Sequence, residues 1–197
     1  MEATSNREQT IRRVVDQRQA GLTLVLEDLH DPHNAAAIFR TCDAFGVQNI
    51  HLVFERERPW KPSQIGTSSS SSANKWLDFT VHESAEAALS TLATDGYRQV
   101  GAAISDNAVS IFDANLSGSR LAVWVGNEHR GLSAQALAGA DQVVEIPMRG
   151  FVQSLNVSVS AALVLYEMTR QRRVTHQDIA ESPTTRNQLL RSLWKKS

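Results

Sequence analysis

The sequence has a single cysteine, Cys42, among its 197 residues. One thiol can form no internal disulfide and cannot build a zinc site alone, which excludes a disulfide-stapled secreted fold and a Cys-rich metal centre. No apolar run approaches the roughly 18 residues of a bilayer-spanning helix. The first 20 residues are polar and carry four Arg, unlike a secretory signal. We therefore expect a cytoplasmic protein that has no membrane segment and no metal.

Glycine is missing where common nucleotide-binding folds require it. The segment after the first predicted strand reads HDPHNAAAIFR, with no glycine that would let the backbone approach a phosphate or ribose. This argues against a Rossmann-type site. The patterns GxxxxGK[ST], HExxH and GxSxG are also absent, so a P-loop, a zinc-protease helix and a serine-hydrolase elbow are not expected. His30, His33 and His129 are scattered, and we interpret them as solvent-facing or locally hydrogen-bonded rather than as metal ligands.

The net charge of −1 conceals basic ends on an acidic body. Residues 1–20 carry four Arg against three acidic residues, and residues 167–197 carry seven Lys or Arg against three, which leaves −6 between them. An acidic body does not favour non-specific polyanion binding, whereas basic ends indicate arms that meet phosphate locally. The alternative is a pair of solvated terminal helices whose charges bind nothing.

Apolar strand patterns alternate with short helical patterns along the chain. Strands rich in Leu, Ile and Val are predicted at residues 22–29, 49–54, 98–104, 121–126 and 143–148. Helices are predicted at residues 5–19, 34–46, 84–96 and 133–140. Residues 55–76, with two Pro and five consecutive Ser, are predicted as a loop. The alternation predicts an α/β fold with a mainly parallel sheet, whose ligands lie outside the carboxyl ends of the strands.

The stretch FVQSLNVSVSAALVLYEM, residues 151–168, begins with small polar side chains at every second position and continues as an apolar run. The alternation is typical of a strand, but 14 residues from Leu155 to Met168 exceed the usual strand length and suit a buried helix. We predict a helix here with Ser154 as its N-cap.

Three segments in this order resemble the motifs of the SpoU family: LEDLHDPHNAAAIFRTCDAFGV, VWVGNEHRGLS and IPMRGFVQSLNVSVSAALVLYEMTRQR. Members are S-adenosylmethionine-dependent RNA ribose 2'-O-methyltransferases of the SPOUT superfamily, an α/β fold with a C-terminal trefoil knot. The likeness spans about residues 22–173, and within the family it is greatest to members that methylate guanosine-18 in the D-loop of tRNA. It implies an N-terminal helical extension at residues 1–20, a methyltransferase domain at 21–168 and a basic C-terminal helical extension at 169–197.

The resemblance also implies the site residues. Those that match the family's S-adenosylmethionine contacts, largely through the main chain, are Ala102, Gly126, Asn127, Glu128, Gly131, Ile146, Met148, Ser154 and Leu155. Those that match catalytic positions are Arg40, Asn34, Ser154, Asn156 and Glu128. In the knot, Ser154 and Asn156 would be small polar groups at a crowded crossing, which accounts for the polar start of an apolar segment.

Arg40 matches the family's catalytic arginine, and Asn34 matches the residue that orients it. A ribose 2'-hydroxyl is a poor nucleophile until its proton is removed or shared. Because an arginine side chain has a pKa above about 12, we interpret Arg40 as a clamp on the phosphate beside the target ribose that stabilises the developing alkoxide. A base role helped by the substrate's own phosphate is the alternative. Glu128 is expected to fix its loop rather than to take the proton.

Transfer RNA and a second copy of the chain are the implied partners. The side chains that match tRNA contacts are Arg7, Arg12, Arg13, Arg18, His33, Arg170, Arg172 and Arg173. In the homodimer Arg40 would meet the cofactor side of the partner subunit. The chain departs from its family at His129, where Lys is common, and at residues 68–72, where five Ser replace a loop richer in Gly and Ala. That loop and the short C-terminal tail are expected to govern RNA selection.

Other functions fit parts of this pattern. The chain is alternatively a 2'-O-methyltransferase for another tRNA or ribosomal RNA nucleotide, a non-catalytic tRNA-binding scaffold, or an unrelated α/β enzyme with a small-molecule substrate. The presence of Asn34, Arg40, Glu128, Ser154 and Asn156 together argues against a scaffold that has lost its chemistry.

Overall fold

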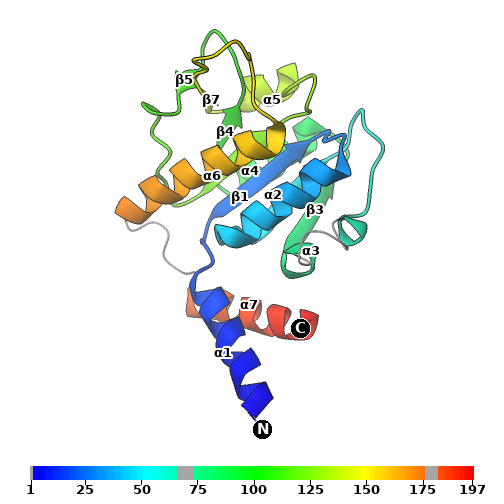
Figure 1. The fold of residues 1–197 in the computed structure, drawn as a ribbon, viewed down its shortest axis with the longest axis vertical. Coiled ribbons are helices and arrows are strands. Elements are labelled where there is room, and N and C mark those ends of the chain that lie inside the picture. The colour runs from blue at the N-terminus through cyan, green and yellow to red at the C-terminus, as the bar shows by residue number, and fades with distance from the viewer. Residues whose placement is uncertain (1, 66–72, 176–181) are drawn as a thin grey trace.

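The computed structural model describes residues 2–65, 73–175 and 182–197. In these ranges the chain forms one seven-stranded sheet with helices on both faces (Figure 1). The strand order is β3-β2-β1-β6-β4-β7-β5, and every neighbouring pair is parallel. The predicted α/β fold with a mainly parallel sheet is confirmed. The strands are β1 Leu22–Glu27, β2 Asn49–Val53, β3 Asp78–His82, β4 Arg98–Ala102, β5 Val109–Ser110, β6 Leu121–Val125 and β7 Gln142–Glu145.

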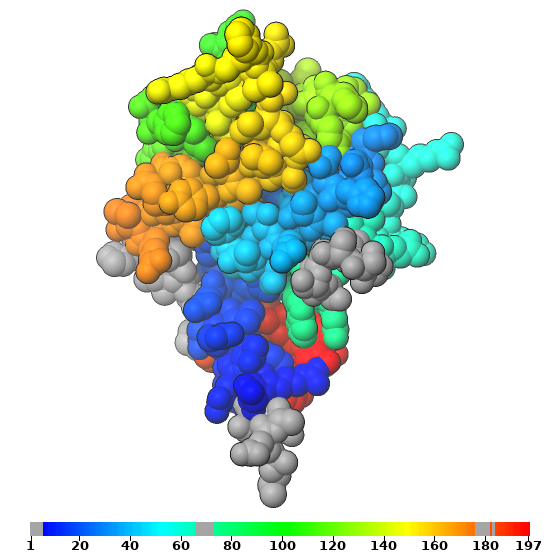
Figure 2. All heavy atoms as spheres, viewed as in Figure 1, coloured from blue at the N-terminus to red at the C-terminus, as the bar shows by residue number. Residues whose placement is uncertain are grey.

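The helices cover the two faces of the sheet and form one end of the molecule. They are α1 Glu2–Asp16, α2 Pro32–Ala44, α3 Ala73–Trp76, α4 Ala85–Thr94, α5 Ala134–Gly139, α6 Val157–Val174 and α7 Pro183–Lys196, with a 3₁₀ turn, η1, at Pro62–Gln64. α2 and α6 lie side by side on one face (Figures 1 and 2), and α4 and α5 pack on the other.

The two neighbouring inner strands, β1 and β6, are buried on both faces. Every residue of β1 and β6 is buried, because helices cover both faces there. Successive side chains of a strand point to opposite faces. Leu24 and Leu26 therefore pack with α2 and α6, while Val25 and Trp124 pack with α4 and α5. The parallel arrangement places the carboxyl ends of β1, β6 and β4 at one edge, where the loops of the site lie.

Four short elements depart from the prediction. β3 and β5 were not predicted, and η1 and α3 fall inside residues 55–76, where the prediction of a loop without elements was wrong. β3 lies at the edge of the sheet, and Thr80 and Val81 are exposed, so it lacks the long apolar run that marks the central strands. The serine run at residues 68–72 lies outside the described residues.

The segment that alternates polar and apolar residues is a helix, as predicted. Its N-cap is Asn156, whose Oδ1 accepts a hydrogen bond from the Ser158 N–H at 2.8 Å. The prediction of Ser154 as N-cap was therefore wrong by two residues. α6 continues to Val174, so residue 168, the predicted end of the methyltransferase domain, lies within it.

α1 and α7 pack against each other at the end of the molecule opposite the loops that follow β4 and β7 (Figure 1). Ile11, Val15 and Leu193 form their small shared core. Arg186 of α7 donates a hydrogen bond from Nε to Asp16 of α1 at 2.6 Å. The basic ends of the chain are thus brought together, although about 170 residues separate them.

Candidate active site

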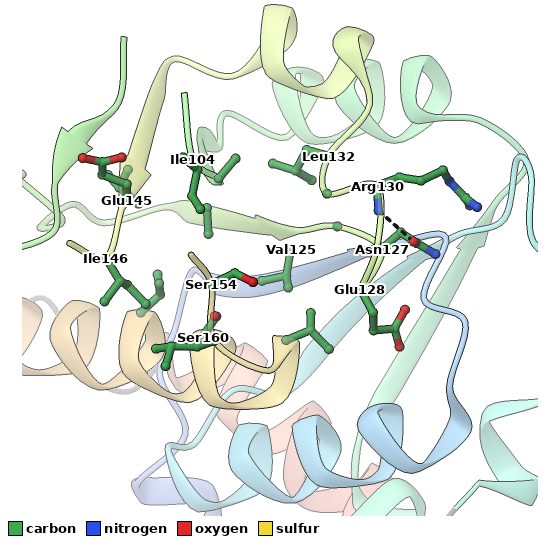
Figure 3. A pocket seen from close by; sticks show the side chains of 18 of the residues that line it. Ile104, Val125, Asn127, Glu128, Arg130, Leu132, Glu145, Ile146, Ser154 and Ser160 are labelled. Carbon is green, nitrogen blue, oxygen red and sulfur yellow. Dashed lines mark hydrogen bonds between the residues drawn. The ribbon is translucent and has the colours of Figure 1, made fainter. Parts of the chain in front are cut away.

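A pocket of about 370 Å³ lies at the carboxyl ends of β4, β6 and β7, closed on one side by residues 153–157 (Figure 3). This size is typical of pockets for small molecules and cofactors. The structure brings together all nine residues that were predicted to contact the cofactor: Ala102, Gly126, Asn127, Glu128, Gly131, Ile146, Met148, Ser154 and Leu155 all line it. Their contact with a cofactor stays a prediction.

The loop at residues 126–131 is held in a closed turn by its own backbone. Asn127 N–H donates to Gly131 O at 3.0 Å, and Gly131 N–H donates to Asn127 O at 2.9 Å. Gly131 adopts φ +67°, and a Cβ added at Gly126 would lie 2.2 Å from the Gly131 carbonyl carbon. Asn127 Oδ1 accepts from the N–H of Arg130 (Figure 3). It also accepts from the N–H of His129. Side chains larger than glycine at these two positions would therefore reshape the pocket wall.

Glu128 joins this loop to the segment that starts α2. Its carboxylate accepts hydrogen bonds from the backbone N–H groups of His30 and Asp31 and from Asn34 Nδ2, each at 3.0 Å. Asn34 Oδ1 in turn accepts from Asn156 Nδ2 at 3.1 Å. A continuous series of hydrogen bonds therefore connects the loops after β1 and β6 with Asn156, the residue that caps α6.

The same hydrogen bonds decide the charge of Glu128. Partial burial of its carboxyl group would raise the pKa, but the hydrogen bonds from Asn34, His30 and Asp31 outweigh burial and hold the pKa below the ordinary glutamate value. Glu128 is therefore an ionised acceptor at neutral pH and a poor proton acceptor. This agrees with the expectation that it fixes its loop.

A second pocket adjoins the first on the α2 side. It is lined by His30, Asp31, Pro32, Asn34, Glu128, His129, Ser154, Leu155, Asn156 and Val157. Four of the five predicted catalytic residues lie here, and Glu128, Ser154 and Leu155 line both pockets. A group bound in the first pocket and a ribose bound in the second would be neighbours.

Arg40 is not in either pocket. It is exposed on α2 and lines a separate groove with His33, Ala37 and Ala162 of α6. A helix turns by about 100° per residue, so Arg40 lies on the stripe of His33, seven residues earlier, and about 120° around the helix from Asn34. Within one chain, therefore, the structure does not bring Arg40 to the other catalytic candidates.

The predicted RNA-binding side chains fall into two groups. Arg7, Arg12, Arg13, His33, Arg170 and Arg173 are exposed. Of these, Arg12 pairs with Glu8 and Arg170 pairs with Glu167. Arg18 and Arg172 are only 3% and 0% exposed, so the prediction that they contact RNA was wrong.

The two buried arginines hold the N-terminal segment to the body. Arg18 pairs with Asp43 of α2 at 2.7 Å. Arg172 donates to Gln19 Oε1 at 3.2 Å and to the carbonyl oxygens of Gly118 and Ala20. The sequence contains a signal for this: Arg172 continues the buried stripe of α6 four residues after Met168, whereas Arg173 does not.

Glu57 lines neither pocket but contacts residues of two loops that build them, and it was not predicted from the sequence. Its carboxylate accepts a hydrogen bond from Arg130 Nη2 at 2.8 Å and lies 2.9 Å from His30 Nδ1. The hydrogen bond to Glu57 raises the pKa of His30, and the hydrogen bonds from His30 and Arg130 lower the pKa of Glu57. Asp28, at φ +51°, accepts the Glu57 backbone N–H and so holds this loop in place. Glu57 thus ties the loop after β1 to the loop after β6.

Residues 2–65, 73–175 and 182–197, the ranges that the structure describes, also bear on metal binding and on membrane insertion. There, no group of three or more His, Cys, Asp or Glu side chains is placed to bind a metal ion. Likewise, none of the helices described is both long and apolar enough to cross a bilayer.

Comparison with known proteins places this site in a family. Residues 21–166 match the model of the SpoU rRNA Methylase family. The tRNA (guanosine(18)-2'-O)-methyltransferase of Escherichia coli K12 is 40% identical over 164 residues, which cover 82% of this chain and 69% of that protein. The enzyme of the same name from Thermus thermophilus is 39% identical over 171 residues, 87% of this chain and 86% of that protein.

A solved structure shows the same architecture. The Aquifex aeolicus TrmH/SpoU tRNA modifying enzyme superposes with a TM-score of 0.86 at 27% identity, over 97% of this chain and 96% of that one. The family match spans the strands, loops and helix that build both pockets, and the identity to the two bacterial enzymes extends over more than four fifths of the sequence. The chain belongs to the SpoU methylase family.

Proposed function

We infer that this chain is a tRNA (guanosine-18 2'-O)-methyltransferase, which moves a methyl group from S-adenosylmethionine to the ribose 2'-hydroxyl of guanosine-18 in the D-loop. The observation that carries the inference is the pair of adjoining pockets, linked through Glu128, Asn34 and Asn156, in a chain 39–40% identical to enzymes of that name.

The first pocket suits S-adenosylmethionine. Its floor and walls include Val125, Leu132 and Ile146, which offer apolar contacts to an adenine ring, and the closed turn at residues 126–131 offers backbone groups to polar atoms. The nine residues predicted for cofactor contact would hold it. When bound, S-adenosylmethionine supplies a methyl group on a positively charged sulfur, which a ribose oxygen can attack.

The second pocket would hold the target ribose. Ser154 and Leu155 line the boundary between the pockets, so they would set the approach of the 2'-hydroxyl. Glu128 accepts hydrogen bonds from three donors, and its pKa lies below the ordinary glutamate value. We therefore propose that Glu128 and Asn34 position the loops of the site and do not accept the proton of the 2'-hydroxyl. Asn156 extends that support to the start of α6.

Arg40 would act from a second subunit. Within one chain, Arg40 and Asn34 line different pockets. The proposed site is therefore complete only if the arginine of a partner subunit reaches the pocket that contains Asn34. The exposed face beside Arg40 is apolar: Val159, Leu163 and Tyr166 of α6 are 45%, 41% and 55% exposed at helical spacing. We propose that a second copy of the chain covers this face.

In this dimer Arg40 holds the phosphate next to the target ribose. A guanidinium stays protonated, pairs with phosphate through two parallel hydrogen bonds and stabilises negative charge that develops on the ribose oxygen. The proton of the 2'-hydroxyl then leaves to the phosphate or to water while Arg40 stays charged.

We also propose the trefoil knot of this family. The chain leaves β7, crosses back toward α2 and starts α6, and Asn156 meets Asn34 at the end of that crossing. Packing of α6 on α2 and the presence of Ser154, Leu155 and Val157 in both pocket walls support a path threaded between the neighbouring loops.

The exposed cations at both ends of the chain would bind tRNA phosphates. Arg7, Arg12, Arg13, Arg170 and Arg173 are the side chains proposed, with His33 beside Arg40. Affinity for tRNA should therefore fall as salt rises. With tRNA as substrate, the protein would work in the cytoplasm.

The function is tested by transfer of a tritiated methyl group from S-adenosylmethionine to tRNA from cells that lack the activity, followed by mass-spectrometric mapping of the modified nucleoside. Label on the ribose of guanosine-18 is the expected result. Label on another tRNA or ribosomal nucleotide would keep the reaction and change the substrate. Absence of label with every RNA, despite cofactor binding in calorimetry, would favour a non-catalytic scaffold.

A further inference from the structure

Residues of α1 and α7 line a groove of about 390 Å³. These two helices lie at the end of the molecule opposite the loops that follow β4 and β7 (Figure 1). The groove is lined by Glu8, Ile11, Arg12, Leu190, Arg191, Trp194 and Lys195. Ile11 and Leu190 belong to the small core between the two helices and give the groove an apolar floor. Trp194 stands at its side with 45% of its surface exposed. A half-exposed indole on an apolar floor offers a flat surface for another ring.

Three of the four charged residues that line this groove are positive: Arg12, Arg191 and Lys195. Residues 182–197 contain four Lys or Arg and no Asp or Glu. Arg186 pairs with Asp16 and Lys196 with Asp78. In the described part of the chain, Arg191 and Lys195 have no carboxylate within ion-pair distance.

The carboxylate that lines the groove is already neutralised. Glu8 accepts hydrogen bonds from Arg12 Nε at 3.0 Å and from Arg12 Nη2 at 2.6 Å. The groove therefore combines an aromatic face, an apolar floor and two cations without an ion-pair partner among the residues described. This combination is complementary to a stacked ring whose neighbours carry negative charge, which is the chemistry of a nucleotide in a single strand.

We propose that this groove binds one unpaired nucleobase of the tRNA substrate, which stacks on Trp194 while Arg191 and Lys195 contact the flanking phosphates. The inference rests on the proposed function, since it takes tRNA as the substrate, and adds an RNA-binding site to the terminal helices. Because the groove is remote from the cofactor pocket, Trp194 contributes to RNA affinity and KM but not to the rate of methyl transfer in the bound complex.

Stacking and charge leave different signatures, which makes the proposal testable. Loss of a base–aromatic stack weakens binding at every salt concentration, whereas loss of a phosphate contact also lowers the slope of log K against log salt. The variants are Trp194→Leu, which keeps an apolar side chain without a ring, and Trp194→Phe, which keeps a smaller ring. Phe112→Leu, at a 75% exposed aromatic after β5, is the matched control. Arg191→Gln and Lys195→Gln remove the cations one at a time.

Affinity for unmodified tRNA is measured by filter binding across a series of salt concentrations, with circular dichroism and S-adenosylmethionine affinity as checks on folding. Trp194→Leu should weaken binding by roughly five- to a hundredfold with an unchanged salt slope. Trp194→Phe should recover most of that loss, and Phe112→Leu should bind as wild type. Arg191→Gln and Lys195→Gln should each lower the slope by about 0.7 to 0.9.

Two results would overturn the proposal while wild-type protein still methylates tRNA: binding by Trp194→Leu indistinguishable from wild type, or equal losses in Trp194→Leu and Trp194→Phe. The first would mean that the groove takes no base, and the second that the indole supports the helix pair or another partner. Failure of the wild-type protein to methylate tRNA would instead contradict the proposed function. The two failures are therefore distinguishable.

Discussion

The Asn34 amide donates a hydrogen bond to the Glu128 carboxylate at 3.0 Å, although 94 residues separate them in the chain. This contact fixes the first turn of α2 against the loop after β6, and so fixes the second pocket against the first. Several of the substitutions predicted below to lower activity act on this hydrogen bond or on residues next to it.

Glu128→Gln should lower kcat/KM by roughly ten- to a hundredfold. The amide cannot accept all three hydrogen bonds that reach the carboxylate, so the two loops lose their fixed relation. Because the pKa of Glu128 lies below the ordinary glutamate value, it titrates outside the working range and does not act as the base. The pH–rate profile around neutral pH should therefore keep its shape, and a lost acid limb in Glu128→Gln would assign the base role to Glu128 after all.

Arg40→Ala should lower methyl transfer by roughly a thousandfold, whereas Arg40→Lys should keep more activity because a point charge still attracts phosphate. Binding of S-adenosylmethionine should be unchanged in both, since Arg40 lies outside the cofactor pocket of its own chain. Initial rates with saturating cofactor measure the first effect, and calorimetry measures the second.

Mixed dimers test where Arg40 acts. Gly126→Ala would place a Cβ 2.2 Å from Gly131 and should close the cofactor pocket of its own subunit. A dimer of one Arg40→Ala subunit and one Gly126→Ala subunit should then regain about half of the wild-type rate, because one complete site remains. If the mixed dimer is as inactive as either parent, Arg40 serves its own subunit.

Glu57→Gln should lower kcat/KM by roughly three- to tenfold, the size expected when two partly exposed ion pairs are lost. Protonated His30 interacts with Glu57 more strongly than neutral His30, and its pKa is raised by that contact. The deficit should therefore be larger at about pH 6 than at about pH 8.5, on either side of the histidine titration. Glu86→Gln removes the same charge on α4 and serves as the control. An equal loss of kcat/KM at both pH values would show that His30 does not contribute to the link that Glu57 makes between the two loops.

Stability should fall below neutral pH because of a buried histidine pair. His51 Nδ1 lies 2.9 Å from His82 Nε2, and burial, followed by the charge of His82, lowers the pKa of His51 to about 4. The folded state thus favours neutral His51, while the unfolded chain binds a proton near pH 6.5. The contribution of neutral His51 to the free energy of unfolding is complete above pH 6.5 and is lost as pH falls toward 4.

This loss should amount to about 2 kcal/mol at about pH 5. Urea unfolding at neutral pH and at this lower pH measures it, and His51→Gln, which keeps hydrogen-bonding groups without titrating in this range, should show a shallower decline. The same decline in His51→Gln would place the acid sensitivity elsewhere, for example at a carboxylate.

Arg172→Gln and Arg173→Gln should have opposite consequences. The first leaves Gln19 and two carbonyl oxygens without their buried partner and should cost about 2–4 kcal/mol of unfolding free energy. The second changes an exposed side chain and should leave stability unchanged while it lowers the salt dependence of tRNA binding. Urea unfolding and filter binding on both variants distinguish an anchor from an RNA contact.

These neighbouring arginines also show what the sequence can and cannot predict. All nine predicted cofactor residues line one pocket, because loops at the carboxyl ends of parallel strands must share an edge of the sheet. Charge alone does not separate Arg172 from Arg173; the buried stripe of α6 does. Glu57 was missed because its partners, 27 and 73 residues away, meet it only in the fold. The proposed action of Arg40 from a second subunit could not be read from any pattern within one chain.

The most direct test of the central claim compares two tRNAs that differ by one oxygen atom. One carries guanosine at position 18 and the other carries 2'-deoxyguanosine there, and both are incubated with enzyme and labelled S-adenosylmethionine. The account predicts one methyl group per molecule on the first tRNA and none on the second, since the 2'-oxygen is the acceptor. Equal labelling of both tRNAs would contradict it, because the methyl group would then be transferred to another atom.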